Sequence, residues 1–184
     1  LWHDREGDSI GMLRRVGLPQ NSNFDGAPWV STTDPCADGW YGITCSGQLV
    51  TKIELGDEGL TGTIPSSLGN LSNIQSLLLY ENSLTGPIPS SLGNLSNLVD
   101  LGLSTNSLTG KIPSSLGDLS NLLDLDLYRN SLTGPIPSLG NLSNLVHLHL
   151  DTNSLTGPIP SSLGNLSNIQ SLWLYENSLT GTIP

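Results

Sequence analysis

The sequence LTGPIPSSLGNLSN at residues 84–97 recurs almost unchanged from Leu108, Leu132 and Leu155. The copies begin 23 or 24 residues apart. A unit of this length can bury its apolar side chains only against the units before and after it, so that the chain stacks into a solenoid. We therefore expect a single domain built from repeated units.

One unit predicts one turn of a coil. Leu77 and Leu79 are two residues apart, as in a short strand with both side chains on one face, whereas the other apolar spacings require the chain to keep turning inward. Equivalent strands of successive turns should pair as a parallel sheet, about 4.8 Å apart. Within one unit the inward positions are Leu71, Ile74, Leu77, Leu79, Leu84, Ile88 and Leu92.

The segment LTGPIP should form a second short extended stretch, because Gly86 permits a tight bend and the prolines oppose a helix. The segment PSSLGN after it predicts a single helical or 3-10 turn that ends at Gly93. The unit at residues 119–141 has PSLGN in place of PSSLGN. We expect the outer face of the coil to absorb this loss without a change in sheet register.

An asparagine stands three residues after the second strand leucine, where the chain leaves the sheet. Its amide both donates and accepts, so stacked asparagines can satisfy backbone groups that would otherwise be buried unpaired. Glu58 occupies this place in the first unit and cannot donate when ionised, so the ladder should begin one unit later. The predicted ladder consists of Asn82, Asn106, Asn130, Asn153 and Asn177.

These units resemble the plant-type leucine-rich repeat, whose pattern LxxLxxLxLxxNxLxGxIPxxLGx is matched throughout residues 47–184. The stretch DPCADGWYGITC at residues 34–45 resembles the N-terminal cap of that family, with two extra residues before Trp40. The same features are similar to those of receptor-like kinase ectodomains and polygalacturonase-inhibiting proteins. The resemblance implies a right-handed solenoid of the α/β horseshoe class, mostly β with short 3-10 turns, a parallel concave sheet and an N-terminal helical cap.

In this description residues 1–46 form the cap and residues 47–184 form six repeats, of which the last is incomplete and has no C-terminal cap. The cap's helix would be DSIGMLRRVGL at residues 8–18, whose apolar side chains have helical spacing, and Trp29 matches a tryptophan of the family cap. Cys36 and Cys45 are the only cysteines. An even count in a capping motif argues for a structural disulfide, since a redox or zinc site needs tighter spacing or more ligands.

A disulfide implies an oxidising compartment, so we expect a secreted or extracellular protein, or the outer part of a membrane protein. With 16 acidic against 6 basic residues and a net charge of −10, the chain lacks the basic patch that nucleic acid requires. No window approaches the roughly 18 uninterrupted apolar residues of a membrane span, and no charged-then-apolar leader follows Leu1.

We expect this chain to be a mature or excised piece of something longer. Because the chain ends at Pro184 within a unit, the apolar edge after Ile183 would be exposed or paired with another chain. Self-association through that end is therefore one of the expectations.

Function should be sought where the units differ and side chains point outward. Three positions in each unit, beside and between the strand leucines, should face outward on the concave sheet. Tyrosine and tryptophan tend to dominate interfaces, and the aspartates among these positions form a negative centre. The candidate partner-binding residues are Leu78, Tyr80, Asp100, Asp124, Asp126, Tyr128, His147, His149, Asp151, Trp173 and Tyr175. The other outward positions hold Lys52, Glu54, Gly56, Ser76, Gly102, Ser104 and Ser171.

This pattern predicts a non-enzymatic recognition module that binds a protein or peptide, with a preference for a cationic partner. The alternative is that exposed positions without a function simply drift. A Ser-His-Asp triad is not expected, because every serine near a histidine is a repeat serine with copies in units that lack histidine. No glycine-rich phosphate loop opens a helix, and no cofactor is expected.

A lesser alternative is a divalent metal site. His147 and His149 lie two residues apart on one strand, next to Asp124 and Asp126 on the adjoining strand. Imidazoles and carboxylates in such an arrangement could share a metal or form a pH-sensitive patch. They would nevertheless sit on an open sheet without an evident outer layer of partners.

The main alternative is an ice-binding solenoid, since certain plant leucine-rich-repeat proteins bind ice. One outward column at the coil spacing would consist of Thr61, Thr85, Thr109, Thr133, Thr156 and Thr180, with Thr63 and Thr182 completing Thr-Gly-Thr pairs at the two ends. The neighbouring column, however, is interrupted by Pro87, Lys111, Pro135 and Pro158. Threonine also suits strands in general, so it can serve there as a β-favouring filler.

The tripeptide Asn-Leu-Ser is an N-glycosylation acceptor and should lie on the outer face. Copying one repeated phrase would produce the same tripeptides without any role, and their occupancy would depend on the host. The candidate sites are Asn70, Asn94, Asn141 and Asn165.

Overall fold

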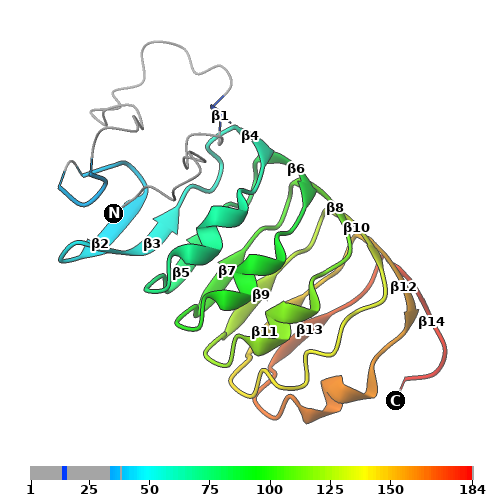
Figure 1. Ribbon diagram of the computed structural model, residues 1–184. Coiled ribbons are helices and arrows are strands. Elements are labelled where there is room, and N and C mark those ends of the chain that lie inside the picture. Colours follow the sequence, from blue (N-terminus) through cyan, green and yellow to red (C-terminus); the bar gives the residue numbers. More distant parts are fainter. Residues whose placement is uncertain (1–13, 16–33, 38, 184) are drawn as a thin grey trace.

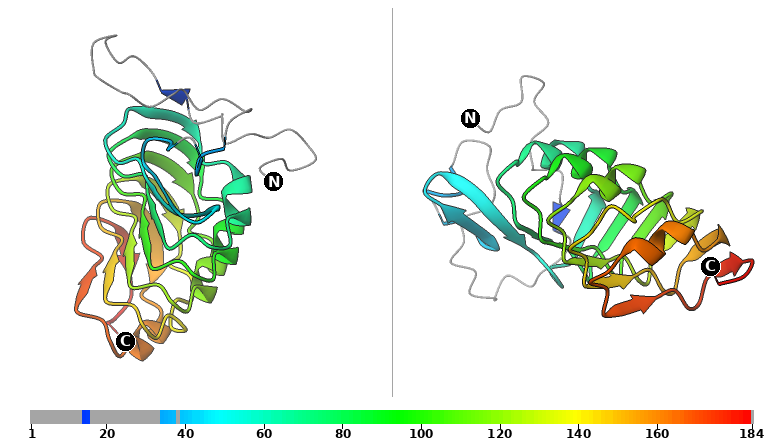
Figure 2. Two further views of the ribbon diagram at one scale, coloured as in Figure 1. Left: turned by 90° about the vertical axis from the view of Figure 1, so that its left-hand side faces the viewer. Right: turned by 90° about the horizontal axis from the view of Figure 1, so that it is seen from below.

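The computed structural model describes residues 14–15, 34–37 and 39–183. Successive units stack in one row as the turns of a coil, and the described part of the cap lies at one end (Figure 1, Figure 2). Each complete turn contributes one strand to each of two sheets. Most turns also carry a short 3-10 helix, and these helices line up along one flank of the coil (Figure 2).

The first sheet is parallel apart from the hairpin of its two N-terminal strands and corresponds to the predicted concave sheet. Its parallel strands pair in line: Ser76 lies opposite Asp100, and Leu77 lies opposite Leu101. Equivalent positions of successive units therefore face one another. In spatial order its strands are β2 (Ile43–Ser46), β3 (Leu49–Glu54), β5 (Ser76–Leu78), β7 (Asp100–Gly102), β9 (Asp124–Asp126), β11 (His147–His149) and β13 (Ser171–Trp173).

The second sheet is built from the LTGPIP segments and has a different register. Thr85 pairs with Ser107, and Gly86 pairs with Leu108, which is a stagger of two residues relative to the repeat. Two residues span about 7 Å, so these strands are inclined to the direction in which the turns stack. Its strands are β1 (Arg14–Arg15), β4 (Leu60–Thr63), β6 (Ser83–Pro87), β8 (Ser107–Gly110), β10 (Ser131–Gly134), β12 (Ser154–Pro158) and β14 (Ser178–Thr180).

This stagger corrects the predicted threonine column. Thr109 lies opposite Ser131 rather than opposite Thr133, and the threonine of each other unit in the staggered ladder likewise faces a serine of the next unit. The threonines of successive units are thus offset along their strands, and a serine of the next unit stands in line with each threonine. The ice-binding alternative was based on an in-line row of threonines, and the second sheet does not form such a row.

The 3-10 helices confirm the turn predicted from PSSLGN. A proline with an extended backbone precedes each one, as Pro89 does with φ −65° and ψ 132°. A Cβ atom on Gly93 would stand 2.5 Å from the carbonyl oxygen of Ser115 in the next turn, so close packing of the turns requires glycine here. Around Gly164, in contrast, nothing lies within 4 Å. The helices are η2 (Ser66–Asn70), η3 (Ser90–Asn94), η4 (Ser114–Asp118) and η5 (Ser161–Asn165).

The shortened unit forms no 3-10 helix at residues 137–141. Both sheets nevertheless keep their registers across it, in line in the first sheet and staggered by two in the second. The prediction that the outer face absorbs the deletion is therefore confirmed. The cost is local: Ser115 Oγ donates to the carbonyl of Ser90 in the preceding turn, whereas Ser162 Oγ is buried without a hydrogen-bond partner among the described residues.

The core consists of columns of leucine and isoleucine enclosed by the two sheets and the 3-10 helices. Leu101 and Leu103 of one turn and Leu108 of the same turn are all at most 1% exposed. Burial of one such side chain contributes roughly 2 kcal/mol, and the same set is buried in turn after turn. The inward positions predicted for one unit are confirmed, although Leu71 is only partly buried.

The asparagine ladder is confirmed. Asn106 Oδ1 accepts a hydrogen bond from the Leu84 N–H of the preceding turn (2.9 Å), and its Nδ2 donates to the Leu79 carbonyl (2.9 Å). The other four predicted asparagines form the same pattern. The ladder begins at Asn82, whose Oδ1 accepts from the Glu58 N–H, as expected from the absence of asparagine at position 58.

Two further features of the coil were not predicted. The residue before each ladder asparagine is left-handed, with φ between 52° and 54°, although none is glycine. Such a conformation costs an L residue about 1 kcal/mol. A second asparagine ladder comes from the recurring LSN phrase. Its members donate to a serine carbonyl of the preceding turn and are Asn97, Asn121, Asn144 and Asn168.

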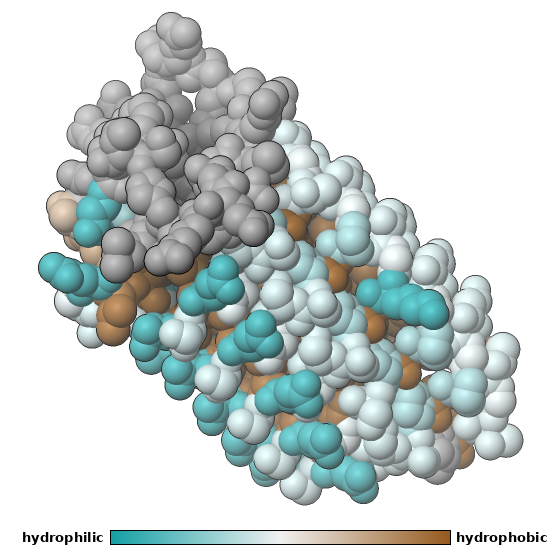
Figure 3. Space-filling view, in the orientation of Figure 1, coloured by the Kyte–Doolittle hydropathy of each residue, from teal (hydrophilic) through white to brown (hydrophobic). Residues whose placement is uncertain are grey.

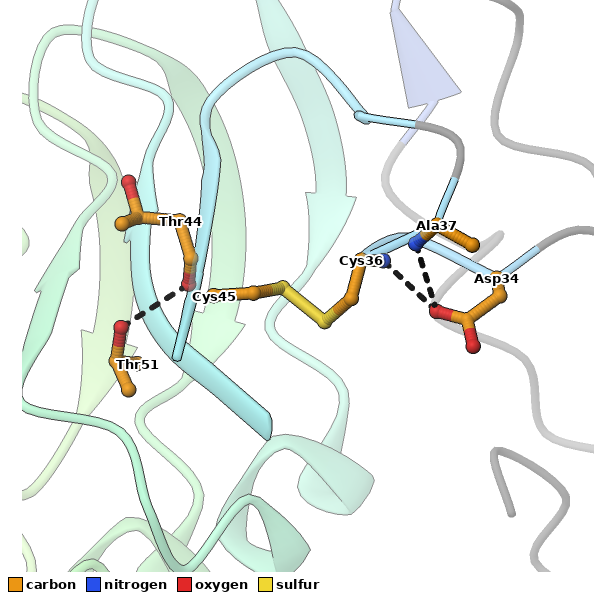
Figure 4. Close-up of a disulfide and its surroundings, with 6 residues drawn as sticks. All are labelled: Asp34, Cys36, Ala37, Thr44, Cys45 and Thr51. Carbon is orange, nitrogen blue, oxygen red and sulfur yellow. Dashed lines mark hydrogen bonds between the residues drawn. A yellow bond between two sulfur atoms is a disulfide. The ribbon is translucent and has the colours of Figure 1, made fainter. Parts of the chain in front are cut away.

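The described part of the cap confirms the disulfide. The sulfurs of Cys36 and Cys45 are bonded, which ties the segment before β2 to that strand (Figure 4). Asp34 Oδ1 accepts from the Cys36 N–H (2.8 Å), and Thr51 Oγ1 donates to the Thr44 carbonyl (3.2 Å). The bridge thus anchors the cap to the first edge of the first sheet.

Of the helix predicted at residues 8–18, only Arg14 and Arg15 fall within the described residues. They form β1, which pairs antiparallel with β4, so the helix is wrong at these two positions. Pairing there satisfies backbone groups on the otherwise open edge of the second sheet. The rest of that segment, and Trp29, lie outside the described residues.

Candidate recognition face

The three predicted outward positions of each unit form three rows across the first sheet, and we call this surface the open face. The first row is Lys52, Ser76, Asp100, Asp124, His147 and Ser171. The second row is Glu54, Leu78, Gly102, Asp126, His149 and Trp173. The third row is aligned by backbone hydrogen bonds between adjacent units just beyond the strands. It consists of Gly56, Tyr80, Ser104, Tyr128, Asp151 and Tyr175. The structure therefore gathers all the candidate residues, while their role in binding stays a prediction.

Apolar side chains near the N-terminal end of this face lie over glycines. A Cβ atom on Gly56 would overlap the ring of Tyr80, and one on Gly102 would come within 2.9 Å of Leu78 Cδ2. The glycines in the neighbouring units therefore leave room for these two larger side chains. Tyr80 remains 39% exposed and offers an aromatic surface to a partner.

The centre of the face is acidic. Asp100 and Asp124 lie opposite each other on β7 and β9. Burial raises the pKa of Asp100 above its usual value, and the hydrogen bond and negative charge of Asp124 raise it further. Two adjacent carboxylates resist full ionisation, so a bound cation would relieve their repulsion.

An aromatic cluster occupies the C-terminal part of the face. The imidazole of His149 stacks on the indole of Trp173, with ring centroids 4.1 Å apart and planes 23° from parallel. Tyr128 meets the same imidazole edge-on at 6.4 Å. Tyr175 lies 6.3 Å from the indole. Trp173 is 45% exposed, so the cluster combines an ordered interior with an accessible aromatic edge.

Both nitrogens of the His149 ring are engaged. Nδ1 lies 2.6 Å from Asp126 Oδ1, and Nε2 lies 2.8 Å from Ser171 Oγ. Burial raises the pKa of Asp126, while the charge of His149 and its hydrogen bond act in the opposite direction. Ser171 was predicted to point outward but was not among the candidate site residues. The strand register brings its hydroxyl to the imidazole.

These contacts give the metal alternative no support. Both ring nitrogens of His149 are engaged in hydrogen bonds, which a metal ligand would have to give up. His147 Nε2 lies 3.7 Å from Asp124 Oδ1. Within the part of the chain that the structure describes, no three His, Cys, Asp or Glu side chains are grouped so as to hold a metal ion.

Asp151 differs from the prediction that it belongs to an exposed negative centre. It is only 3% exposed, between the third-row positions of Tyr128 and Tyr175. Hydrogen bonding to Asp151 raises the pKa of the Tyr175 hydroxyl, because the neutral phenol can donate to the carboxylate. Asp151 therefore lies beneath the exposed surface of the face.

The four candidate glycosylation asparagines are all exposed. Three of them end a 3-10 helix, and the next residue makes a tight turn, as Leu95 does with φ −79° and ψ 65°. Hydrophilic side chains follow this flank in a diagonal row (Figure 3). The acceptors thus lie apart from the open face, and their occupancy stays a prediction.

A family model described as "Leucine-rich repeat region" matches residues 53–182. The chain belongs to the leucine-rich repeat family. Among the curated relatives of this leucine-rich repeat chain is "Receptor-like kinase TMK4" from Arabidopsis thaliana, which is 37% identical over 75 residues. That match covers 41% of this chain and 8% of the kinase.

Solved plant ectodomains share the fold. The LRR ectodomain of the plant membrane receptor kinase GASSHO1/SCHENGEN3 from Arabidopsis thaliana, in complex with CASPARIAN STRIP INTEGRITY FACTOR 2, is 51% identical with a TM-score of 0.69, over 70% of this chain and 16% of that one. The Arabidopsis receptor kinase HAESA, in complex with the peptide hormone IDA and the co-receptor SERK1, is 37% identical with a TM-score of 0.73, over 82% of this chain and 26% of that one.

The chain thus spans less than a tenth of the length of that curated kinase and about a sixth to a quarter of the two solved chains. The matching family is a repeat region and indicates no catalytic class. Across the described ranges, the structure contains no helix with both the length and the apolar character that a membrane crossing needs.

Proposed function

We propose that this leucine-rich repeat chain is an extracellular recognition module that binds a peptide or protein segment along the open face. The observation that carries the proposal is the in-line pairing of the positions at which the units differ. One extended partner that crosses the strands could contact several of these positions at once. The HAESA ectodomain, which has a similar fold, is solved with a peptide hormone.

The layout of the face suggests the chemistry of the partner. Tyr80 and Trp173 stand near the two ends of the face, and Asp100 and Asp124 stand between them. The units of Tyr80 and Trp173 are four strands apart, or about 19 Å at 4.8 Å per strand. An extended peptide covers that span with about six residues at roughly 3.3 Å each. We infer a segment with apolar residues toward both ends and a lysine or arginine between them.

A peptide-display screen with the purified chain tests this proposal. We expect selected peptides of this pattern, and Trp173→Ala should weaken their binding by about 30-fold, as expected for a large aromatic anchor. Thr109→Val on the second sheet is the matched control and should leave the affinity unchanged. If binding survives the combined replacement of Tyr80, Tyr128 and Trp173 by alanine, the proposed face is wrong.

The cationic preference has its own test. Replacing the central lysine of a selected peptide by norleucine keeps most of the side chain and removes the charge. Affinity should fall by about 10-fold for the native chain but change little for the Asp100→Asn, Asp124→Asn double variant. An equal loss for both chains would show that the acidic pair does not read the charge.

The extracellular location rests on the Cys36–Cys45 disulfide and on the similarity to receptor ectodomains. Expression through a eukaryotic secretory pathway, followed by site-specific mass spectrometry, measures the occupancy of the four Asn-Leu-Ser acceptors. Self-association and the boundaries at residues 1–46 and 47–184 stay predictions that sedimentation and limited proteolysis can check.

A further inference from the structure

Three side chains on the open face form one continuous hydrogen-bonded line. Asp126 on β9 meets Nδ1 of His149 on β11 at 2.6 Å, and Nε2 of the same ring meets Ser171 Oγ on β13 at 2.8 Å. An acid, an imidazole and a hydroxyl in this order are the parts of an activated nucleophile. We propose that Ser171 is a nucleophilic serine that small activated aryl esters can acylate, with His149 as its base. The proposal goes beyond peptide recognition and does not rest on it.

The hydrogen bonds assign the proton positions. An ionised Asp126 can only accept, so His149 carries its proton on Nδ1 and presents the Nε2 lone pair to the Ser171 hydroxyl. The imidazole is held in this orientation by stacking on Trp173 and by the edge contact with Tyr128. The side chain of His149 is 15% exposed, so the base is sheltered, while Ser171 is half-buried and remains accessible.

The register singles out Ser171 from its copies. Ser76 occupies the same row on β5, but it is 3% exposed and its neighbours in the row are Lys52 and Asp100. In sequence these serines are copies of one repeat position, and a triad was therefore not expected. They differ because only Ser171 lies on a strand adjacent to that of His149.

The surroundings limit the chemistry to activated substrates. None of the outward positions of the first sheet is an asparagine or glutamine that could stabilise an oxyanion. The Ser171 N–H already donates to the Val146 carbonyl (3.1 Å). An ester with a good aryl-oxide leaving group needs the least such help, and the half-exposed indole of Trp173 offers a surface on which its aryl ring can stack.

The reaction balances with water as the only co-reactant. Ser171 Oγ bonds to the acyl carbon, and its proton passes to His149 Nε2. The bond from the acyl carbon to the aryl oxygen breaks, and the leaving phenol takes that proton. Water then attacks the acyl-serine with the same imidazole as base, releasing the carboxylic acid and restoring the serine.

A fluorophosphonate probe and p-nitrophenyl acetate test the proposal on the full chain, with peptide mapping by mass spectrometry. We expect Ser171 to be labelled at least ~10-fold faster than any other serine, and Ser171→Ala to abolish the fast phase. Ser178→Ala, an exposed serine on the second sheet, is the matched control and should label like the native chain. Equal labelling of Ser171 and Ser178 would overturn the proposal, provided that circular dichroism shows the variants folded.

Asp126 is a positioning residue, because it contacts the imidazole of His149 and not the substrate. Asp126→Asn should lower the labelling rate of Ser171 by ~10-fold or more, because the side-chain amide no longer holds the Nδ1 proton of the ring as a carboxylate does. Asp126→Glu keeps the carboxylate and should restore part of the rate. Equal labelling rates in Asp126→Asn and in the native chain would contradict the assigned role.

Discussion

The two sheets of this coil come from the same units but use them differently. In the first sheet equivalent positions pair in line, and the exposed positions differ from unit to unit. In the second sheet the strands are staggered by two residues, and each strand from β6 onward exposes one serine and one threonine at the same two positions. The difference indicates that the second sheet holds the turns together, whereas the first presents a surface whose chemistry can vary without disturbing the coil.

The largest effect should come from the point at which the chain passes from one sheet to the other. Asn106 links the Leu84 N–H of the second sheet with the Leu79 carbonyl at the end of a first-sheet strand. Asn106→Ala leaves these groups unpaired and should lower the free energy of unfolding by about 3 kcal/mol in urea denaturation. Asn97→Ala, which removes one exposed hydrogen bond, should cost about 1 kcal/mol or less. Equal costs would mean that the inner ladder does not couple the sheets.

The second largest loss of stability should come from changing the distance between successive turns, which is common to both sheets. A methyl group on Gly93 would collide with the backbone of Ser115, so Gly93→Ala should cost about 2 kcal/mol of stability. Gly164→Ala adds the same methyl group where nothing lies within 4 Å and should change stability by less than about 0.5 kcal/mol. Thermal unfolding of the two variants side by side makes the comparison. Similar melting temperatures would contradict the required close approach.

A smaller effect on stability should come from the negative charge of Asp100 in the first sheet. The raised pKa of Asp100 means that its ionised form is disfavoured in the folded protein, so its contribution to stability is lost as pH rises through that pKa. Asp100→Asn should therefore be more stable than the native chain at pH 7, by less than about 1 kcal/mol because the site is partly exposed. The gain should vanish at pH 3, and cationic peptides should bind the variant more weakly. A loss of stability at pH 7 would contradict this account.

The smallest effect is expected on the second sheet. Thr109 is exposed and faces a serine of the next unit. Thr109→Val keeps the β-branched shape and should change the free energy of unfolding by less than about 0.5 kcal/mol, with no change in peptide affinity. A clear loss of binding in this variant would show that the second sheet also contacts the partner. It would contradict the assignment of binding to the first sheet alone.

Much of the fold could be predicted because it depends on contacts whose pattern repeats in the letters. The inward leucines and the ladder from Asn82 follow from the chemistry of a residue type at a recurring position. The Cys36–Cys45 bridge follows from an even cysteine count in a segment that resembles the family cap. The second ladder at Asn97 was missed although its signal, the asparagine of LSN, is equally regular. At Arg14 and Arg15 the helical spacing of the apolar residues gave a wrong prediction, because these two residues pair with strand β4 instead of forming a helix.

The candidate site was only half predictable. The outward positions follow from the two-residue period of a strand, and they do share one face. Their burial does not follow: Asp151 and Ser76 are each 3% exposed, and each stands between larger side chains of the two adjacent units. The contact of Ser171 with His149 was likewise not predicted, because Ser171 has copies in units that lack histidine and was set aside as a repeat serine.

The sequence by itself determined the coil, its inward columns and the face on which the variable side chains stand, because these depend on spacing within one unit. Only the tertiary structure decided how one unit lies against the next. The first sheet is in line and the second is staggered because their strands have different inclinations to the stacking direction, which no single unit encodes. That register places Asp126, His149 and Ser171 in contact and takes the threonines out of line.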